Sequence, residues 1–154
     1  MTTLEKKMEA DNSMLYKVSA ASALMMILVF STMKILGLLY VVELRALNFL
    51  IMFFGVRYIL LRLRTENEGT LEYLPALFTG FFTAFLTSTL FAVFIGAYLM
   101  VDSNLMQHLI SSQPLGYSLT PASSALVIEF EGSASGAIVA FALVNLFNRD
   151  NVQG

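Results

Sequence analysis

Residues Tyr73–Val101 read YLPALFTGFFTAFLTSTLFAVFIGAYLMV, and no side chain in this stretch carries a charge. As an α-helix it would be about 43 Å long, at ~1.5 Å per residue, which exceeds the roughly 30 Å hydrocarbon core of a bilayer. Soluble domains rarely contain a helix that is apolar on every side. The stretch therefore predicts a transmembrane helix, and with it an integral membrane protein.

The composition of the whole chain agrees with this prediction. Hydrophobic residues make up 57% of the 154 residues and charged residues only 13%, whereas a soluble domain carries about 25% charged residues. Cysteine is absent, which excludes disulfides, thiolate catalysis and Cys-based metal sites. The net charge of -2 is too small to indicate nucleic acid as a partner. We expect the lipid bilayer to surround one transmembrane domain over residues 1–154.

Three further apolar stretches extend this prediction to an all-α bundle of four membrane-spanning helices. The expected spans cover residues 18–42, 46–61, 73–101 and 123–147. A tight connection over residues 43–45 joins the first two spans, and residues 62–69 form the most polar loop. Residues 1–14 are expected to be a short amphipathic or frayed lead-in, and residues 148–154 a short tail. The start of the last span stays open between Ser123 and Gly132.

A short amphipathic helix is expected between the third and fourth spans, over residues 102–112. Leu105, Met106, Leu109 and Ile110 recur at helical spacing, and polar side chains occupy the other face. Asp102 or Ser103 would cap its start. Such a helix is typical of a membrane surface.

The distribution of Lys and Arg predicts the orientation. With four spans, one side of the membrane receives Lys6, Lys7, Lys17, Arg62, Arg64 and Arg149, and the opposite loops receive only Arg45. By the positive-inside rule both termini are cytoplasmic.

Small residues recur every fourth position in the last two spans, as close helix packing in lipid requires. The third span contains Gly80, Ala84, Ser88, Ala92 and Gly96, and the fourth contains Gly132, Gly136 and Ala140. Either these stripes pack against each other within the chain, or one of them faces another protein. The sequence is compatible with both.

Four ionisable residues fall within the expected spans, and such residues are candidates for function because burying a charge in lipid is costly. They are Lys34, Arg57, Glu129 and Glu131. Arg57 can extend its long side chain to the headgroups as an anchor. Glu129 and Glu131 lie in the outer part of the last span and point about 200° apart on a helix, so at most one faces the bundle. Lys34, at a similar expected depth, is the natural counter-ion, and we hypothesise a Lys34–Glu129 or Lys34–Glu131 pair.

Catalytic signatures are missing from the chain. His108 is the single histidine and lies on the polar face of the amphipathic segment, where it makes a poor metal or haem ligand. No phosphate-binding loop, dinucleotide fingerprint, nucleophile elbow or zinc-protease motif is present. We therefore expect no enzyme activity, no metal and no cofactor.

Part of the chain resembles a known family. The likeness covers residues 53–110 and rests on Phe54–Tyr58, on Gly69–Gly80 and on Tyr98–Asp102, which read FGVRY, GTLEYLPALFTG and YLMVD. These motifs resemble an uncharacterised (domain-of-unknown-function) family of small four-span bacterial inner-membrane proteins. The resemblance implies the same four-span layout and supplies no activity or catalytic residues. The first span and the final segment match in hydropathy only, and Glu129-Phe130-Glu131 has no place in the family's pattern.

Two functions remain open from the sequence. The first is an accessory or scaffold subunit of a larger membrane complex, such as a respiratory or transport assembly, with other membrane proteins as partners. The second is a small oligomeric transporter or ion channel that uses the intramembrane charges. No internal sequence repeat joins the two halves of the chain, which disfavours the second reading.

Overall fold

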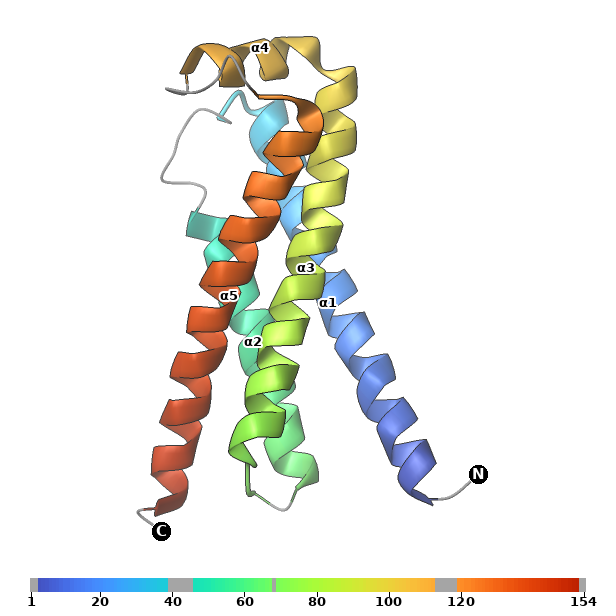
Figure 1. The fold of residues 1–154 in the computed structure, drawn as a ribbon, viewed down its shortest axis with the longest axis vertical. Helices are drawn as coiled ribbons and strands as arrows, with labels where there is room; N and C mark the ends of the chain where they lie inside the picture. The colour runs from blue at the N-terminus through green and yellow to red at the C-terminus, as the bar shows by residue number, and fades with distance from the viewer. Residues whose placement is uncertain (1–2, 39–45, 68, 113–118, 153–154) are drawn as a thin grey trace.

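The computed structural model describes residues 3–38, 46–67, 69–112 and 119–152. These ranges contain the helices α1 (Thr3–Ile35), α2 (Ala46–Glu66), α3 (Tyr73–Val101), α4 (Ser103–Ser112) and α5 (Pro121–Val152). All but α4 contain a stretch long and apolar enough to cross a membrane. α4 lies across one end of the bundle, and the described ends of α1 and α5 lie at the other (Figure 1). The predicted all-α architecture with four spans is confirmed.

The first span ends earlier than predicted. α1 stops at Ile35 rather than at Val42, because Gly37 adopts a left-handed conformation with φ 70°. The Leu38 N–H donates to the Met33 carbonyl at 2.8 Å and the Gly37 N–H to the Lys34 carbonyl at 3.1 Å. This pair of bonds is a Schellman C-cap, which satisfies carbonyls that the end of a helix leaves free. The apolar residues after Gly37 concealed this stop, and the connection predicted at residues 43–45 lies outside the described residues.

The start of the last span is settled by a reciprocal cap. The Thr120 hydroxyl accepts from the Ser123 N–H at 3.1 Å, and the Ser123 hydroxyl accepts from the Thr120 N–H at 2.8 Å. Pro121 occupies the first helical position, where its missing N–H costs nothing. α5 therefore begins at Pro121, and the candidate span Pro121–Asn148 includes both glutamates. Helix also continues through most of the expected lead-in and tail, to Thr3 and Val152. α2 extends to Glu66, so the prediction that the second span ends at residue 61 and that residues 62–69 form a loop is wrong for residues 62–66.

The small-residue stripes of α3 and α5 face each other. A Cβ atom added to Gly136 would collide with Cβ of Ala84, and one added to Gly80 would lie 3.0 Å from Cβ of Ala140. Gly132 faces Ser88 in the same way. Close approach of the two backbones thus depends on residues without bulky side chains. The remaining stripe residues follow the same interface: Gly96 faces Ala125, and Ala92 is buried.

α1 is held to α3 by buried hydroxyl groups. The Ser19 hydroxyl donates to the Thr83 carbonyl at 3.2 Å, and the Thr87 hydroxyl approaches the Ser19 carbonyl at 3.5 Å. Against α2, the Ser22 hydroxyl lies 2.5 Å from where a Cβ of Gly55 would be, so an alanine there would require this hydroxyl to rotate away. In hydrocarbon such contacts replace the hydrophobic force that joins helices in water.

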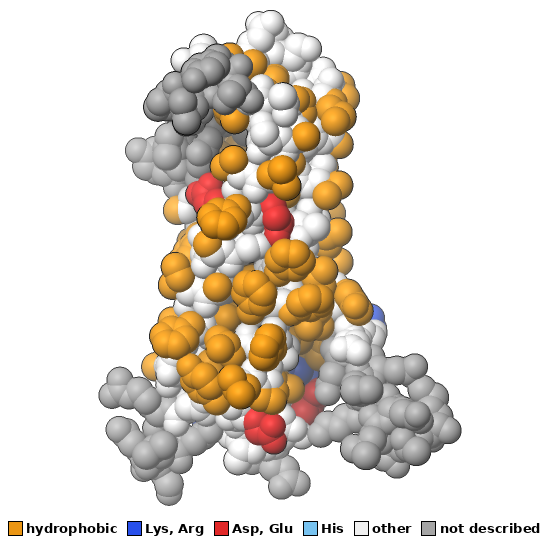
Figure 2. Space-filling view, in the orientation of Figure 1, with side chains coloured by type: hydrophobic (Ala, Val, Ile, Leu, Met, Phe, Trp, Pro, Cys, Tyr) orange, Lys and Arg blue, Asp and Glu red, His pale blue; other side chains and the backbone are white. Residues whose placement is uncertain are grey.

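The lateral surface is largely apolar. Figure 2 shows hydrophobic side chains over most of the visible flank, interrupted by acidic side chains. Large side chains that a soluble protein would bury are exposed here, such as Phe78 at 70% and Phe130 at 78%. An environment of lipid accounts for this surface, because exposing so much apolar area to water would cost free energy, whereas contact with hydrocarbon does not.

Candidate functional site

The contacts between α3 and α5 give the depth of each charge in the membrane. Gly132 faces Ser88, Gly136 faces Ala84 and Ala140 faces Gly80. The two helices are therefore antiparallel, and each step of four residues forward along α5 is matched by a step of four residues backward along α3. Thr87 is the middle residue of α3 (Tyr73–Val101), and we take it as the centre of the bilayer. Depths can then be counted from Thr87 at ~1.5 Å per residue.

Glu129 and Glu131 lie beside the middle residues of α3. Continuing the register places Glu131 level with Thr89 and Glu129 level with Phe91, about 3 Å and 6 Å from the centre. Glu129 is half-buried and Glu131 is exposed. The expectation that at most one of the two faces the bundle is therefore met, with Glu129 as the inward residue.

Glu129 contributes to a polar group inside the bundle. Its Oε1 accepts a hydrogen bond from the Ser133 hydroxyl at 2.7 Å, while its Oε2 is buried and has no partner among the described residues. Asn48, one helical turn before Met52 on α2, also has a buried and unpaired acceptor, Oδ1. Met52 lies against Gly132 and Gly136, so Asn48 stands close to the depth of Glu129. Two acceptors without donors at one depth are costly in a low-dielectric interior.

Arg57 lies nearer the end of the bundle that holds the described ends of α1 and α5 (Figure 1). Its neighbour Val56 contacts the position of Gly80, which places Arg57 about 12 Å from the centre of the membrane. The hydrocarbon core extends about 15 Å from its centre, so the exposed guanidinium reaches the headgroups easily. The geometry agrees with an anchoring role.

Lys34 pairs with Asp102, and the hypothesis that it pairs with Glu129 or Glu131 is wrong. Its ammonium group forms an ion pair with Oδ2 of Asp102 at the junction of α3 and α4. The physical reason is the early end of α1. Because the helix stops at Ile35, Lys34 lies in the last turn at the edge of the bundle instead of several residues inside the span.

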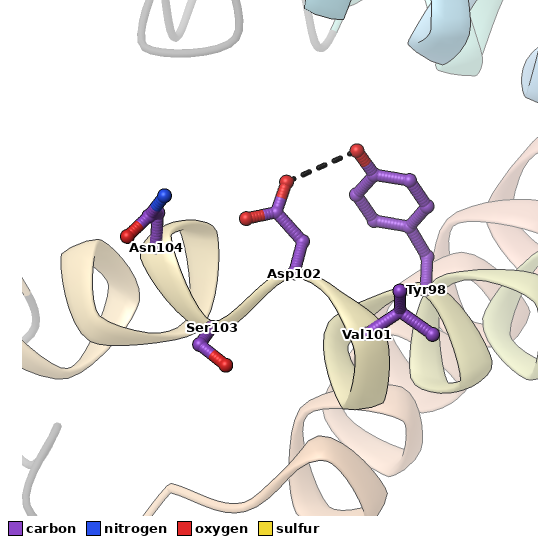
Figure 3. Close-up of a pocket in the computed structure, with 5 residues that line it drawn as sticks. All are labelled: Tyr98, Val101, Asp102, Ser103 and Asn104. Carbon is purple, nitrogen blue, oxygen red and sulfur yellow. Dashed lines mark hydrogen bonds between the residues drawn. The ribbon is translucent and has the colours of Figure 1, made fainter.

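Asp102 is the centre of a corner that joins α1, α3 and α4. Its Oδ1 accepts from the Leu105 N–H at 3.0 Å, which makes Asp102 the N-cap of α4, as one of the two predicted caps. Its Oδ2 also accepts from the Tyr98 hydroxyl at 3.1 Å (Figure 3). Lys34 lies 5.4 Å from the centre of the Tyr98 ring, in a cation–π contact.

The hydrogen bond from Lys34, followed by those from the Leu105 N–H and the Tyr98 hydroxyl, lowers the pKa of Asp102 from 3.8 to about 2. Both carboxylate oxygens are occupied by groups of the chain itself. A shallow, open depression beside this corner is lined by Tyr98, Val101, Asp102, Ser103 and Asn104 (Figure 3). Because both of its carboxylate oxygens already accept hydrogen bonds from groups of the chain, we assign the corner a structural role.

Sequence reasoning treated Asp102 only as a helix cap. Its position four residues after Tyr98, directly after an uncharged span, was the available signal for an interfacial ion pair. Its partner on another helix could not be read from spacing. Among the described residues no group of three or more His, Cys, Asp or Glu side chains is arranged to hold a metal ion.

Comparison with known proteins shows the family of the chain. A family model described as "Protein of unknown function (DUF4199)" matches residues 17–127. The chain belongs to this family. The match extends beyond the motifs in residues 53–110 into the first span and the start of α5, and it ends before Glu129. No curated protein and no solved structure matches the chain.

Proposed function

We propose that this membrane protein is a non-catalytic accessory or scaffold subunit of a larger membrane complex. The observation that supports the proposal is the exposed carboxylate of Glu131 near the middle of a membrane-spanning helix. An uncompensated acidic side chain at the helix centre costs roughly 3 kcal/mol on insertion scales, and more where it cannot reach water. Glu131 cannot extend to the headgroups, because it lies about 12 Å inside the hydrocarbon edge and has a short side chain. A protein neighbour would remove that cost.

The other polar groups of the bundle support the same proposal, because many of them already have partners within the chain. Lys34 and Asp102 satisfy each other at one end, and the Ser19 and Thr87 hydroxyls are used between α1 and α3. The small-residue stripes are used between α3 and α5. A bundle whose helices are joined by these contacts, with a charge left on its outside, is suited to docking.

The test is the composition of the protein purified in a mild detergent and measured by native mass spectrometry. We expect the full-length, untagged chain to run in a stoichiometric complex with at least one other membrane protein. A chain that runs alone under conditions that preserve known complexes of the same membrane would contradict the proposal.

The expected location is a bacterial inner membrane with both termini in the cytoplasm. The end of the bundle that holds the described ends of α1 and α5 also holds Arg62 and Arg64, at the end of α2 (Figure 1). Basic residues favour the cytoplasmic side. Fusions of a cytoplasm-active and a periplasm-active reporter to each terminus test this: the cytoplasm-active reporter alone should work at both ends.

A second candidate function is a small oligomeric transporter or channel, and the unpaired acceptors of Asn48 and Glu129 favour it. Buried oxygens without donors could receive a proton or a small cation during transport. Flux into liposomes that contain the purified protein, lost in Glu129→Gln and retained in Arg57→Gln, would support this function. Equal flux with and without the protein would exclude it.

A further inference from the structure

The outer face of α5 combines a charge with surroundings that suit a second helix. We define this face by Val127, Phe130, Glu131, Ala134 and Ile138, all of which are exposed. Val127, Glu131, Ala134 and Ile138 recur at helical spacing and form one stripe. Ala134 is small enough to let another backbone approach next to the carboxylate, as interhelical contacts in membranes require.

We propose that the outer face of α5 binds a transmembrane helix of a different protein, and that this helix carries a lysine or arginine near the centre of the membrane. The inference rests on the proposed subunit function and adds the surface and the chemistry of the partner. A basic side chain at the depth of Glu131 would neutralise the carboxylate inside the bilayer, where an ion pair is poorly screened. The apolar neighbours would pack around the pair and exclude lipid.

A second copy of this chain fits the surface less well. In a side-by-side dimer with both copies in the same orientation, each residue meets residues of equal depth. The described basic residues of the spans lie at other depths. The contact of Ser19 with α3 places Lys17 about 9 Å from the depth of Glu131, and the contact of Val56 places Arg57 about 15 Å from it. Lys34, paired with Asp102, lies more than 15 Å from that depth. Side chains on a helix lean toward its N-terminus, which carries Lys17 further away. Among the described residues, therefore, none of these three basic side chains can meet Glu131 of a second copy.

The experiment places a photo-reactive amino acid at Ala134 of the full chain in native membranes and identifies the cross-linked peptide. A second probe at Phe78, which is 70% exposed on α3, is the control for random contact. We expect the Ala134 probe to capture an apolar segment of one other membrane protein, with a Lys or Arg in its middle third. The Phe78 probe should not capture that segment.

Variants then test the carboxylate. We expect Glu131→Lys to lower the cross-linking yield at least tenfold and Glu131→Gln to lower it severalfold. Glu72→Lys, the same charge reversal at an exposed acid before α3, should leave the yield unchanged. Exchanging the captured basic residue for Glu should restore the yield of Glu131→Lys. The purified Glu131 variants should unfold at the same midpoint as the native chain, because the side chain is exposed.

The possible outcomes separate the two proposals. Capture of a second copy, capture of lipid alone, or an unchanged yield in Glu131→Lys would each overturn the inference. Arg45 is the rival within the chain: if Arg45→Glu restores the Glu131→Lys variant, the cation belongs to this chain and the inference fails. If native mass spectrometry still finds a partner in any of these cases, the proposed function stands without this surface. If the chain runs alone, both fail.

Discussion

Replacing Gly136 by alanine tests the α3–α5 interface most directly. The added methyl group would overlap Cβ of Ala84 and lie 3.2 Å from Sδ of Met52 and 3.5 Å from Cα of Ala84. Carbon atoms pack at about 3.5–4.0 Å, so we work out that the helices must separate by about 1.5 Å. Ala84 cannot rotate away, because its methyl group is fixed to the backbone. The separation would weaken contacts along much of the interface.

The magnitude follows from two opposing effects. Overpacking of this kind costs roughly 1–3 kcal/mol, and replacing a helical glycine by alanine returns about 1 kcal/mol at most. We expect the free energy of unfolding to fall by about 1–2 kcal/mol in Gly136→Ala. In Gly80→Ala the methyl group would lie 3.0 Å from Cβ of Ala140, which a shift of about half an ångström relieves. That variant should be close to neutral.

The measurement is reversible unfolding of the purified protein in mixed micelles, followed by circular dichroism. Ala84→Gly removes the atom that the new methyl group meets, so the double variant Gly136→Ala/Ala84→Gly should recover most of the loss. Ala142→Val, on the exposed side of the same helix, is the control for added volume and should change little. Equal losses in Gly80→Ala and Gly136→Ala, or no recovery in the double variant, would refute the proposed packing.

Four further predictions concern single contacts. Asp102 has its pKa lowered to about 2, so its ion pair stabilises the fold above its ordinary pKa of 3.8. This contribution is lost as the pH falls from 3.8 toward 2. The unfolding midpoints of the native chain and of Asp102→Asn should therefore differ at pH 6 and converge near pH 2. At pH 6 Asp102→Ala should be less stable than Asp102→Asn, because asparagine still caps α4, and equal midpoints would contradict the cap. Ser19→Ala should cost about 0.6 kcal/mol, the average for a hydrogen bond between membrane helices, and a double-mutant cycle with Thr87→Val should show coupling. Thr120→Val should cost about 1 kcal/mol and Thr120→Ser almost nothing, since serine preserves the reciprocal cap; equal stability of the two would argue against it.

The sequence by itself determined the class of protein and the number of crossings. The uncharged stretch Tyr73–Val101 is a helix with those same bounds, because in hydrocarbon every backbone hydrogen bond must be made within the segment. The spacing of Leu105 and Met106, which are both buried, likewise predicted α4. The angle between Glu129 and Glu131 was also readable from the chain, since it depends only on helical periodicity.

Only the tertiary structure decided depth and partnership. The end of α1 depends on a Schellman cap at Gly37, which an unbroken apolar run conceals, and that end moves Lys34 from the interior of the span to Asp102. The register of Gly132 and Gly136 against α3 places Glu131 beside the middle of α3. Local sequence patterns determine which residues are helical and which face of the helix each one occupies. An ion pair or a depth depends instead on how separate helices are aligned. That alignment comes from contacts between residues far apart in the chain.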